Sequence, residues 1–113
     1  MAAINLTGPH DLNRLTVYLT VSDPYGMYVL VDSNKKVLRV GRSDDDLKKR
    51  ITDYIGLQKF AQCTQFWFQK AGSIQEAFEL ECLAFHHYQP PLNDIHPARP
   101  AGTNYACPTG CGL

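Results

Sequence analysis

One glutamate in the second half of the chain is surrounded by apolar positions. Three and four residues before and after Glu81 the sequence has only alanine and phenylalanine, at Ala77, Phe78, Ala84 and Phe85. Residues at these separations are neighbours on a helix, and burying an unpaired carboxylate among them costs free energy. Glu81 is therefore either the ion-pair partner of an arginine from elsewhere in the chain, or a metal ligand or acid/base group.

The cations of the chain are concentrated in residues 35–50. The formal net charge is zero, with eleven basic and eleven acidic residues, yet seven of the eleven cations fall in this segment. A basic patch on a neutral protein suits a local phosphate contact better than a long nucleic-acid track. A solvated hairpin and helix surface is the simpler alternative.

Arginines and tyrosines of this region have types and spacings that could serve chemistry. Arg39 interrupts a short apolar run, where an arginine either reaches solvent at a sheet edge or binds an anion. Arg50 and Tyr54 are four residues apart on a predicted helix. They form either a stacked surface contact or a guanidinium and a phenol that face a phosphate together. Tyr28 lies in a predicted strand, where half-buried packing is the default interpretation.

The elements that must position these residues follow from local patterns. Apolar, β-prone residues on both sides of a polar loop of about five residues predict a hairpin. Ser43, followed by three aspartates, is placed as the N-cap of a helix, and Ser73 with Glu76 forms a capping box before a longer one. The predicted order is strand, strand, helix, strand, helix, at residues 27–31, 37–41, 43–56, 63–70 and 73–88.

This order predicts a small α/β (α+β) fold with a β-β-α-β-α core, in which a three-stranded, mainly antiparallel sheet is flanked by helices. One domain is expected at residues 1–93, with its core at about 24–93. An irregular lead-in is expected at 1–14, and 15–22 is either a strand or a short helix. Residues 94–113, which contain proline, glycine and cysteine, are expected to form an irregular tail.

The composition gives expectations for the compartment. No apolar run approaches the ~20 residues of a membrane span, and the N-terminal segment lacks the basic start and apolar core of a secretory signal. We expect a cytoplasmic protein with no membrane partner and with reduced cysteines. Cys63 and Cys82 fall in a predicted strand and a predicted helix, where a cysteine is typically a small buried hydrophobic residue.

Five short motifs in a fixed order resemble those of the GIY-YIG nuclease superfamily. The resemblance covers about residues 24–93, and it respects both the order and the spacing of the motifs. Each motif alone is weak, whereas five in order on the expected frame are specific. They are Gly26-Met27-Tyr28, Val40-Gly41, Leu47-x-x-Arg50, Glu76-Ala77-x-x-x-Glu81 and Pro91-Leu92-Asn93.

The resemblance implies hydrolysis of DNA phosphodiester bonds that depends on one Mg²⁺ or Mn²⁺ ion. By position, Tyr28 matches a tyrosine that acts as, or assists, the general base, and Arg50 matches an arginine that contacts the scissile phosphate. Glu81 matches the glutamate that is the metal ligand. Tyr54 matches a position that faces the active site, and Asn93 matches a mainly structural asparagine. The resemblance specifies no substrate preference and no oligomeric state.

The second motif departs from the family pattern. Where the family has Tyr-Ile-Gly, this chain has Arg39-Val40-Gly41. We expect Arg39, with Arg42 nearby, to lie in the site and bind phosphate; a phenol with a pKa of ~10 also needs a cation to become a base near neutral pH. The alternatives to an endonuclease are a catalytically weakened nucleic-acid-binding module and a non-enzymatic interaction domain.

The C-terminal cysteines resemble half of a zinc ribbon, that is, one cysteine knuckle. Cys107 and Cys111 are separated by three residues rather than the usual two, and His96 precedes them. A structural Zn²⁺ needs four ligands, so these three would require one from elsewhere in the chain or from a second subunit. An irregular tail with two free thiols is the simpler interpretation.

Overall fold

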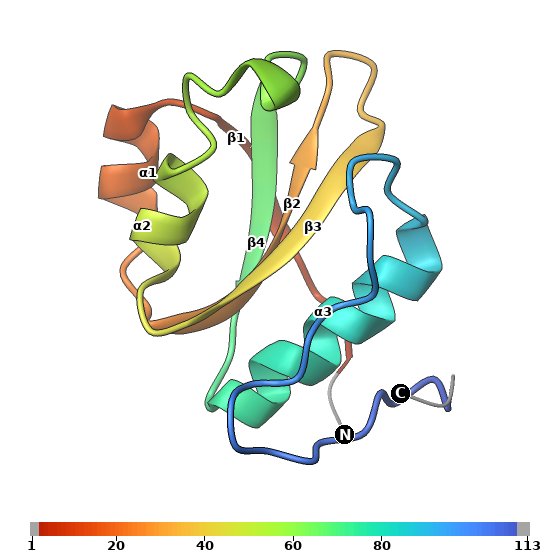
Figure 1. Ribbon diagram of the computed structural model, residues 1–113. Helices are drawn as coiled ribbons and strands as arrows, with labels where there is room; N and C mark the ends of the chain where they lie inside the picture. Colours follow the sequence, from red (N-terminus) through yellow and green to blue (C-terminus); the bar gives the residue numbers. More distant parts are fainter. Residues whose placement is uncertain (1–2, 111–113) are drawn as a thin grey trace.

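The computed structural model describes residues 3–110. Its centre is an antiparallel sheet of four strands in the order β1-β4-β2-β3 (Figure 1). None of the helices in the described part of the chain is long and apolar enough to cross a bilayer. In chain order the elements are β1 (Thr7–Asp11), α1 (Arg14–Thr20), β2 (Tyr25–Val31), β3 (Val37–Asp44), α2 (Leu47–Thr52), a 3₁₀ turn (Gln58–Phe60), β4 (Gln65–Lys70) and α3 (Ile74–Tyr88).

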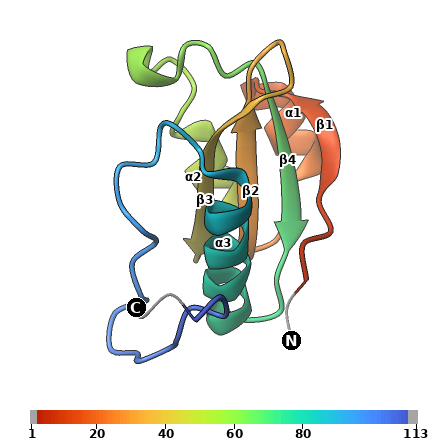
Figure 2. The same cartoon turned by 90° about the vertical axis from the view of Figure 1, so that its right-hand side faces the viewer.

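Helices cover both faces of the sheet. The alternation of side chains along β2 sends Tyr28 and Leu30 into the core beneath α1 and α2, and Met27 and Val29 into the core beneath α3. Figure 2 shows α3 in front of the sheet and the two shorter helices behind it. The continuous run of buried residues in β2 follows from this burial on both faces.

The sheet has one strand more than the sequence predicts. Residues 7–11, expected to be irregular, form the edge strand β1 and pair with β4, with His10 opposite Phe66 and a register shift between Thr7 and His10. Gly8 is required there, because a Cβ would lie 2.8 Å from Cδ2 of Trp67. The ambiguous segment that follows contains helix α1, whose N-terminal Thr16 amide donates to Asn13 Oδ1 at 2.8 Å.

The predicted N-cap at Ser43 is wrong. Ser43 belongs to β3, and its hydroxyl accepts from the amides of Asp45 at 3.1 Å and Asp46 at 2.7 Å while donating to Pro24 O at 2.8 Å. Asp46 is the actual N-cap, because its carboxylate accepts from the Lys49 amide. The helix ends at Thr52, so that Tyr54 lies in the turn after it.

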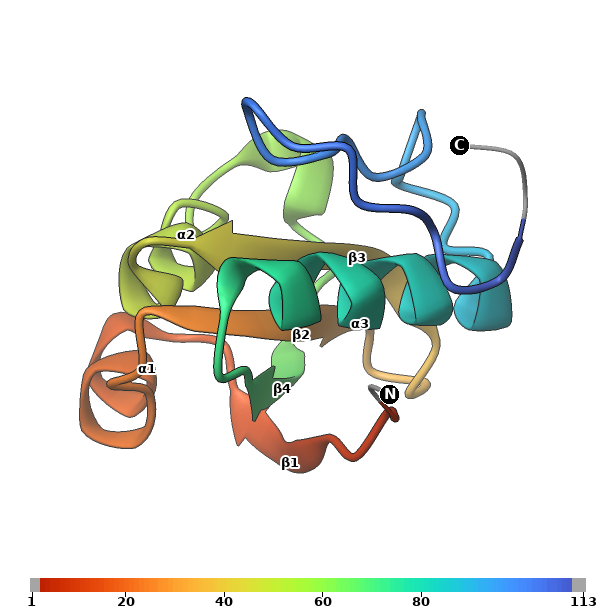
Figure 3. The ribbon, with the colours of Figure 1, turned by 90° about the horizontal axis from the view of Figure 1, so that it is seen from below.

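The N-cap of α3 and its end at residue 88 are as predicted. Ser73 Oγ accepts from the Glu76 amide at 3.1 Å, and the Glu76 carboxylate accepts in return from Gly72 N at 2.8 Å. Beyond the helix, residues 94–110 contain no further helix or strand. They first run back alongside α3 toward its N-terminal end, and then turn and run in the opposite direction (Figure 3).

The segment that links α3 to this tail is bonded to the free side of β3. Leu92 N donates to Leu38 O at 2.9 Å. The Asn93 side chain accepts from Val40 N and donates to Val40 O, both at 2.9 Å. The amide of Asn93 thus imitates the pairing that a neighbouring strand would give.

Candidate active site

Side chains from both faces of the sheet meet at the β3 edge. Arg39 projects toward the α2 side, where it contacts Tyr54, and Arg42 projects toward the α3 side, where it contacts Glu81. Between them lies a depression of about 220 Å³. Its lining residues are Tyr28, Arg39, Gly41, Arg42, Asp44, Arg50, Tyr54, Glu81 and Ala98. Asn93 lines an adjoining cavity that also includes Arg39, Tyr54 and Glu81.

The Tyr28 side chain extends from β2 to this edge by lying over Gly41 of β3. It is opposite Gly41 in the β2–β3 pairing, and a Cβ on Gly41 would overlap the Tyr28 ring, with Cε2 only 2.8 Å away. The ring can lie over β3 only because this position has no side chain. Tyr28 Oη then lies 2.7 Å from Tyr54 Oη, with the two rings edge to face.

The two phenols are held in a setting that disfavours charge on Tyr28. Burial raises the pKa of Tyr28 well above its ordinary value, and the neighbouring Tyr54 and the Glu81 carboxylate raise it further. Arg39 lowers this pKa, in the direction expected from the sequence, but its effect is outweighed. Tyr28 is therefore a neutral phenol near pH 7.

This shift predicts how stability depends on alkaline pH. Above the unfolded-state tyrosine pKa of ~10, the unfolded chain ionises Tyr28 while the folded chain keeps it neutral, so stability falls by up to ~1.4 kcal/mol per pH unit. Tyr28→Phe should lack this component of the loss, whereas Tyr18→Phe, on an exposed ring, should retain it. Urea unfolding followed by circular dichroism at pH 8 and at alkaline pH measures the difference. Equal pH dependence in the two variants would contradict the raised pKa.

Arg39 is anchored beside the phenols. Its Nε donates to Tyr54 Oη at 3.3 Å and its Nη1 donates to Leu92 O at 2.9 Å. The guanidinium also stacks at 5.8 Å from the ring centroids of Tyr54 and Phe60. Within residues 3–110 its Nη2 makes no hydrogen bond, so a fixed cation keeps donors for a ligand.

Glu81 is paired with an arginine, the first of the two alternatives for an isolated buried carboxylate. Arg42 Nη1 donates to Glu81 Oε1 at 2.7 Å, and the same guanidinium forms a two-bond contact with Asp44. Burial raises the pKa of Glu81, while Arg42 and then Arg39 oppose this rise. Across the described residues no hydrogen bond reaches Glu81 Oε2, so one carboxylate oxygen remains available to a cation.

Arg50 and Asp44 complete the lining. Arg50 is exposed, and in the described part of the chain its guanidinium forms no hydrogen bond or ion pair; it is Arg39 that stacks on Tyr54. Sequence reasoning missed Asp44 because the run of three aspartates was assigned to a helix start. Its position as the last residue of β3 places it beside Arg42 instead.

The depression has the donors that a hard divalent cation prefers. Mg²⁺ and Mn²⁺ bind oxygen ligands, keep several waters and are commonly held by one or two carboxylates. Glu81 Oε2 offers one such oxygen, Asp44 lies in the same depression, and the volume leaves room for water and a phosphate group. The residues therefore fit this kind of ion.

Comparison with known proteins supports the fold. Neither protein-family models nor curated protein sequences match the chain. Among solved structures, the GIY-YIG N-terminal endonuclease domain of UvrC from Thermotoga maritima, a point mutant bound to its catalytic divalent cation, superposes with a TM-score of 0.58 at 18% identity. The match covers 69% of this chain and 91% of that domain. The chain therefore has the GIY-YIG fold.

Proposed function

We propose that the protein is a divalent-metal-dependent endonuclease that hydrolyses phosphodiester bonds in DNA. One observation carries the proposal: Glu81, Arg50 and the Tyr28–Tyr54 pair line a single depression at the sheet edge. These residues come from three different elements and from the turn after α2. The fold likeness to an endonuclease domain is consistent with this reaction.

In this proposal Glu81 holds one Mg²⁺ or Mn²⁺ through its available oxygen, with Asp44 able to assist. When bound, such an ion withdraws charge from a phosphate oxygen and stabilises the leaving group. Arg50 and the Nη2 of Arg39 bind the remaining phosphate oxygens, which gain charge in the transition state. Arg42 fixes the orientation of Glu81 through Oε1.

In this proposal the two phenols position the reacting groups and do not act as general bases. Because Tyr28 is neutral, it serves as a hydrogen-bonding group that positions a water or a phosphate oxygen, with Tyr54 as its partner at 2.7 Å. Tyr54 also supplies a second phenol where the motif tyrosine is replaced by Arg39. The replacement therefore leaves two phenols in the depression and adds a cation beside them.

A second function is favoured by one specific observation. The ion pair between Arg42 and Glu81 competes with metal for the carboxylate, as expected in a nucleic-acid-binding module with weakened catalysis. Such a module would bind DNA with an affinity that falls as salt rises, without turnover. An interaction domain that is not an enzyme would bind neither DNA nor a divalent cation at this edge.

The test is cleavage of supercoiled plasmid and of branched DNA by the purified protein, with Mg²⁺ or Mn²⁺ or with EDTA. We expect nicking that needs the divalent cation in the wild type, and a lower rate in Arg39→Tyr because a phosphate-binding cation is lost. Cleavage by Arg39→Tyr alone would instead mean that Arg39 has silenced the enzyme. Salt-dependent DNA binding without cleavage by either protein would favour the binding module.

A further inference from the structure

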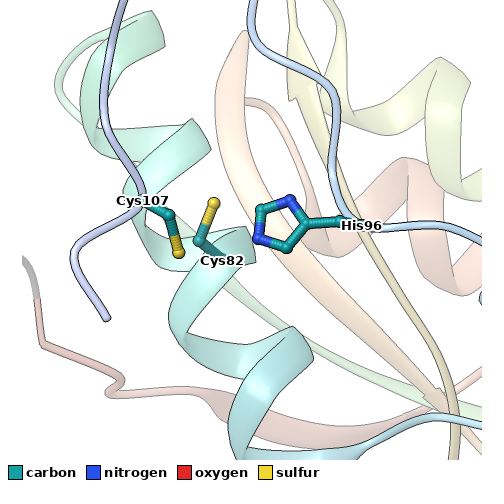
Figure 4. A group of neighbouring side chains, drawn as sticks. All are labelled: Cys82, His96 and Cys107. Atoms are coloured by element: carbon teal, nitrogen blue, oxygen red, sulfur yellow. The ribbon is translucent and has the colours of Figure 1, made fainter. Parts of the chain in front are cut away.

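A second group of metal-binding side chains lies on the outer side of α3. Cys82 comes from the helix, and His96 and Cys107 come from the tail; one ligand atom of each lies within 4.8 Å of the other two. Figure 4 shows the His96 ring directed at Cys82, with the Cys107 sulfur on the other side of the helix residue. Both cysteines are buried and His96 is half-buried.

The tail is attached to the helix through side chains. Among the described residues, the backbone hydrogen bonds from Thr103 N to Pro100 O and from Gly110 N to Cys107 O both close turns within the tail. Cys107 and Tyr105 pack with Phe78 and Cys82 on α3, and the His96 ring lies against the rings of Phe85 and His86. Ordering an irregular segment costs conformational entropy, and a metal ion held by both the helix and the tail would offset part of that cost.

The donor set selects one class of metal. Two thiolates and one imidazole are soft and borderline ligands, which suit Zn²⁺ and not the Mg²⁺ expected at Glu81. Zinc bond lengths place tetrahedral ligands ~3.3–3.8 Å apart. The group would therefore close by about 1 Å to reach coordination distance.

The His96 ring is already oriented for such a role. Its Nδ1 lies 2.9 Å from Pro97 O. Since a carbonyl oxygen only accepts, Nδ1 carries the proton and Nε2 keeps the lone pair that a metal needs. Nε2 also lies 3.1 Å from His86 Nε2, which makes His86 one candidate for the fourth ligand.

We propose that Cys82, His96 and Cys107 bind a structural Zn²⁺ ion that fastens the tail to α3. The sequence predicts that Cys82 is a small buried residue, and it is buried. The proposal adds a ligand role to this packing role, and it supplies the ligand from elsewhere that the sequence interpretation lacked. Cys111, named with Cys107 and His96 in that interpretation, lies outside the described residues. By sequence it is the other candidate for the fourth position.

The proposed ion would also shape the active-site depression from outside. Ala98, two residues after His96, lines the depression itself, and Pro97 lines the adjoining cavity next to Glu81. Fixing His96 and Cys107 therefore fixes one wall of the space that substrate would enter. The zinc proposal itself does not rest on the proposed function, because zinc is measured without DNA.

The experiment is zinc quantification by mass spectrometry of the full chain purified without chelators, with thiols counted by Ellman's reagent. We expect about one Zn²⁺ per chain in the wild type and at least a tenfold loss in Cys82→Ser, Cys107→Ser and His96→Ala. Cys63→Ser is the matched control, since Cys63 is a buried thiol in the other core, and it should keep the ion. Loss in His86→Ala or in Cys111→Ser identifies the fourth ligand.

A readout on the wild type keeps the proposal testable if a variant does not fold. Replacing the ion by Co²⁺ should give the visible absorption of a tetrahedral site with thiolate ligands. A wild type that takes up neither Zn²⁺ nor Co²⁺, or one in which non-reducing mass analysis finds a Cys82–Cys107 disulfide, overturns the proposal. Retention of the ion in all three ligand variants overturns it as well.

Discussion

Replacing Glu81 by glutamine should reduce metal-dependent DNA cleavage by about 10³-fold, the scale expected when a group that stabilises transition-state charge is lost. Glutamine has nearly the same shape but no negative charge, so it should bind a divalent cation far more weakly. The fold should persist, because Arg42 keeps its two bonds to Asp44 and an amide oxygen can still accept from it. Initial nicking rates across a Mg²⁺ titration measure the effect.

The matched control is Glu79→Gln on the same helix. Glu79 lies outside the depression, and within residues 3–110 its carboxylate accepts only a long hydrogen bond from Gln75, at 3.4 Å. The Glu79→Gln variant should cleave DNA at the wild-type rate. If Glu81→Gln retains its rate and its Mg²⁺ dependence, Glu81 is an ion-pair partner of Arg42 and nothing more, and the proposed metal ligand is wrong.

Gly41→Ala should cost about 1–3 kcal/mol of stability, the range for overpacking a filled core, and should sharply lower cleavage. The new methyl group would occupy the place of the Tyr28 ring. The ring would have to leave β3, and its hydrogen bond to Tyr54 would be lost. Chemical denaturation measures the stability loss, and the nicking assay measures the effect on the site.

Making Gly41→Ala in a chain that already lacks the Tyr28 ring tests whether the clash with that ring causes the loss of stability. In a Tyr28→Leu chain the ring is absent, so the further cost of Gly41→Ala should fall below ~1 kcal/mol and the two changes should be strongly non-additive. Gly72→Ala is the matched glycine control, since the nearest atom to its added Cβ would be Glu76 Oε1, at an ordinary contact distance of 4.0 Å. Equal cost in both backgrounds would mean that Tyr28 does not set the need for glycine.

The fold could be predicted from the sequence wherever the signal is local. The long helix has its capping residues and its apolar face within one segment, so its position follows from pattern alone. β1 gives no such signal: Gly8 and Pro9 indicate a loop, and the strand exists because β4, more than fifty residues later, offers a free edge. Ser43 was misplaced because a hydroxyl followed by acidic residues caps a helix or a turn equally well.

In the candidate site, too, some features follow from local sequence and others depend on distant contacts. The motifs brought Tyr28, Arg50 and Glu81 together in expectation, and the structure places them around one depression. The pairing of Glu81 with Arg42 depends on how α3 crosses β3, which no local pattern specifies. The thiol cluster depends on a tail without regular structure folding back onto α3. Cys82 lies 14 residues before His96, so the short spacing typical of paired zinc ligands could not identify it as a candidate.

The amide of Asn93 has a consequence for solubility. β3 is the last strand of the sheet, and an exposed strand edge is a template on which another copy of the chain can add and begin to aggregate. Leu92 and Asn93 occupy that template at Leu38 and Val40. The β3 edge is left uncovered after Val40, where Gly41, Arg42 and Asp44 line the depression. The edge of β3 is thus blocked to another copy of the chain where Leu92 and Asn93 lie, and it remains accessible where it borders the depression.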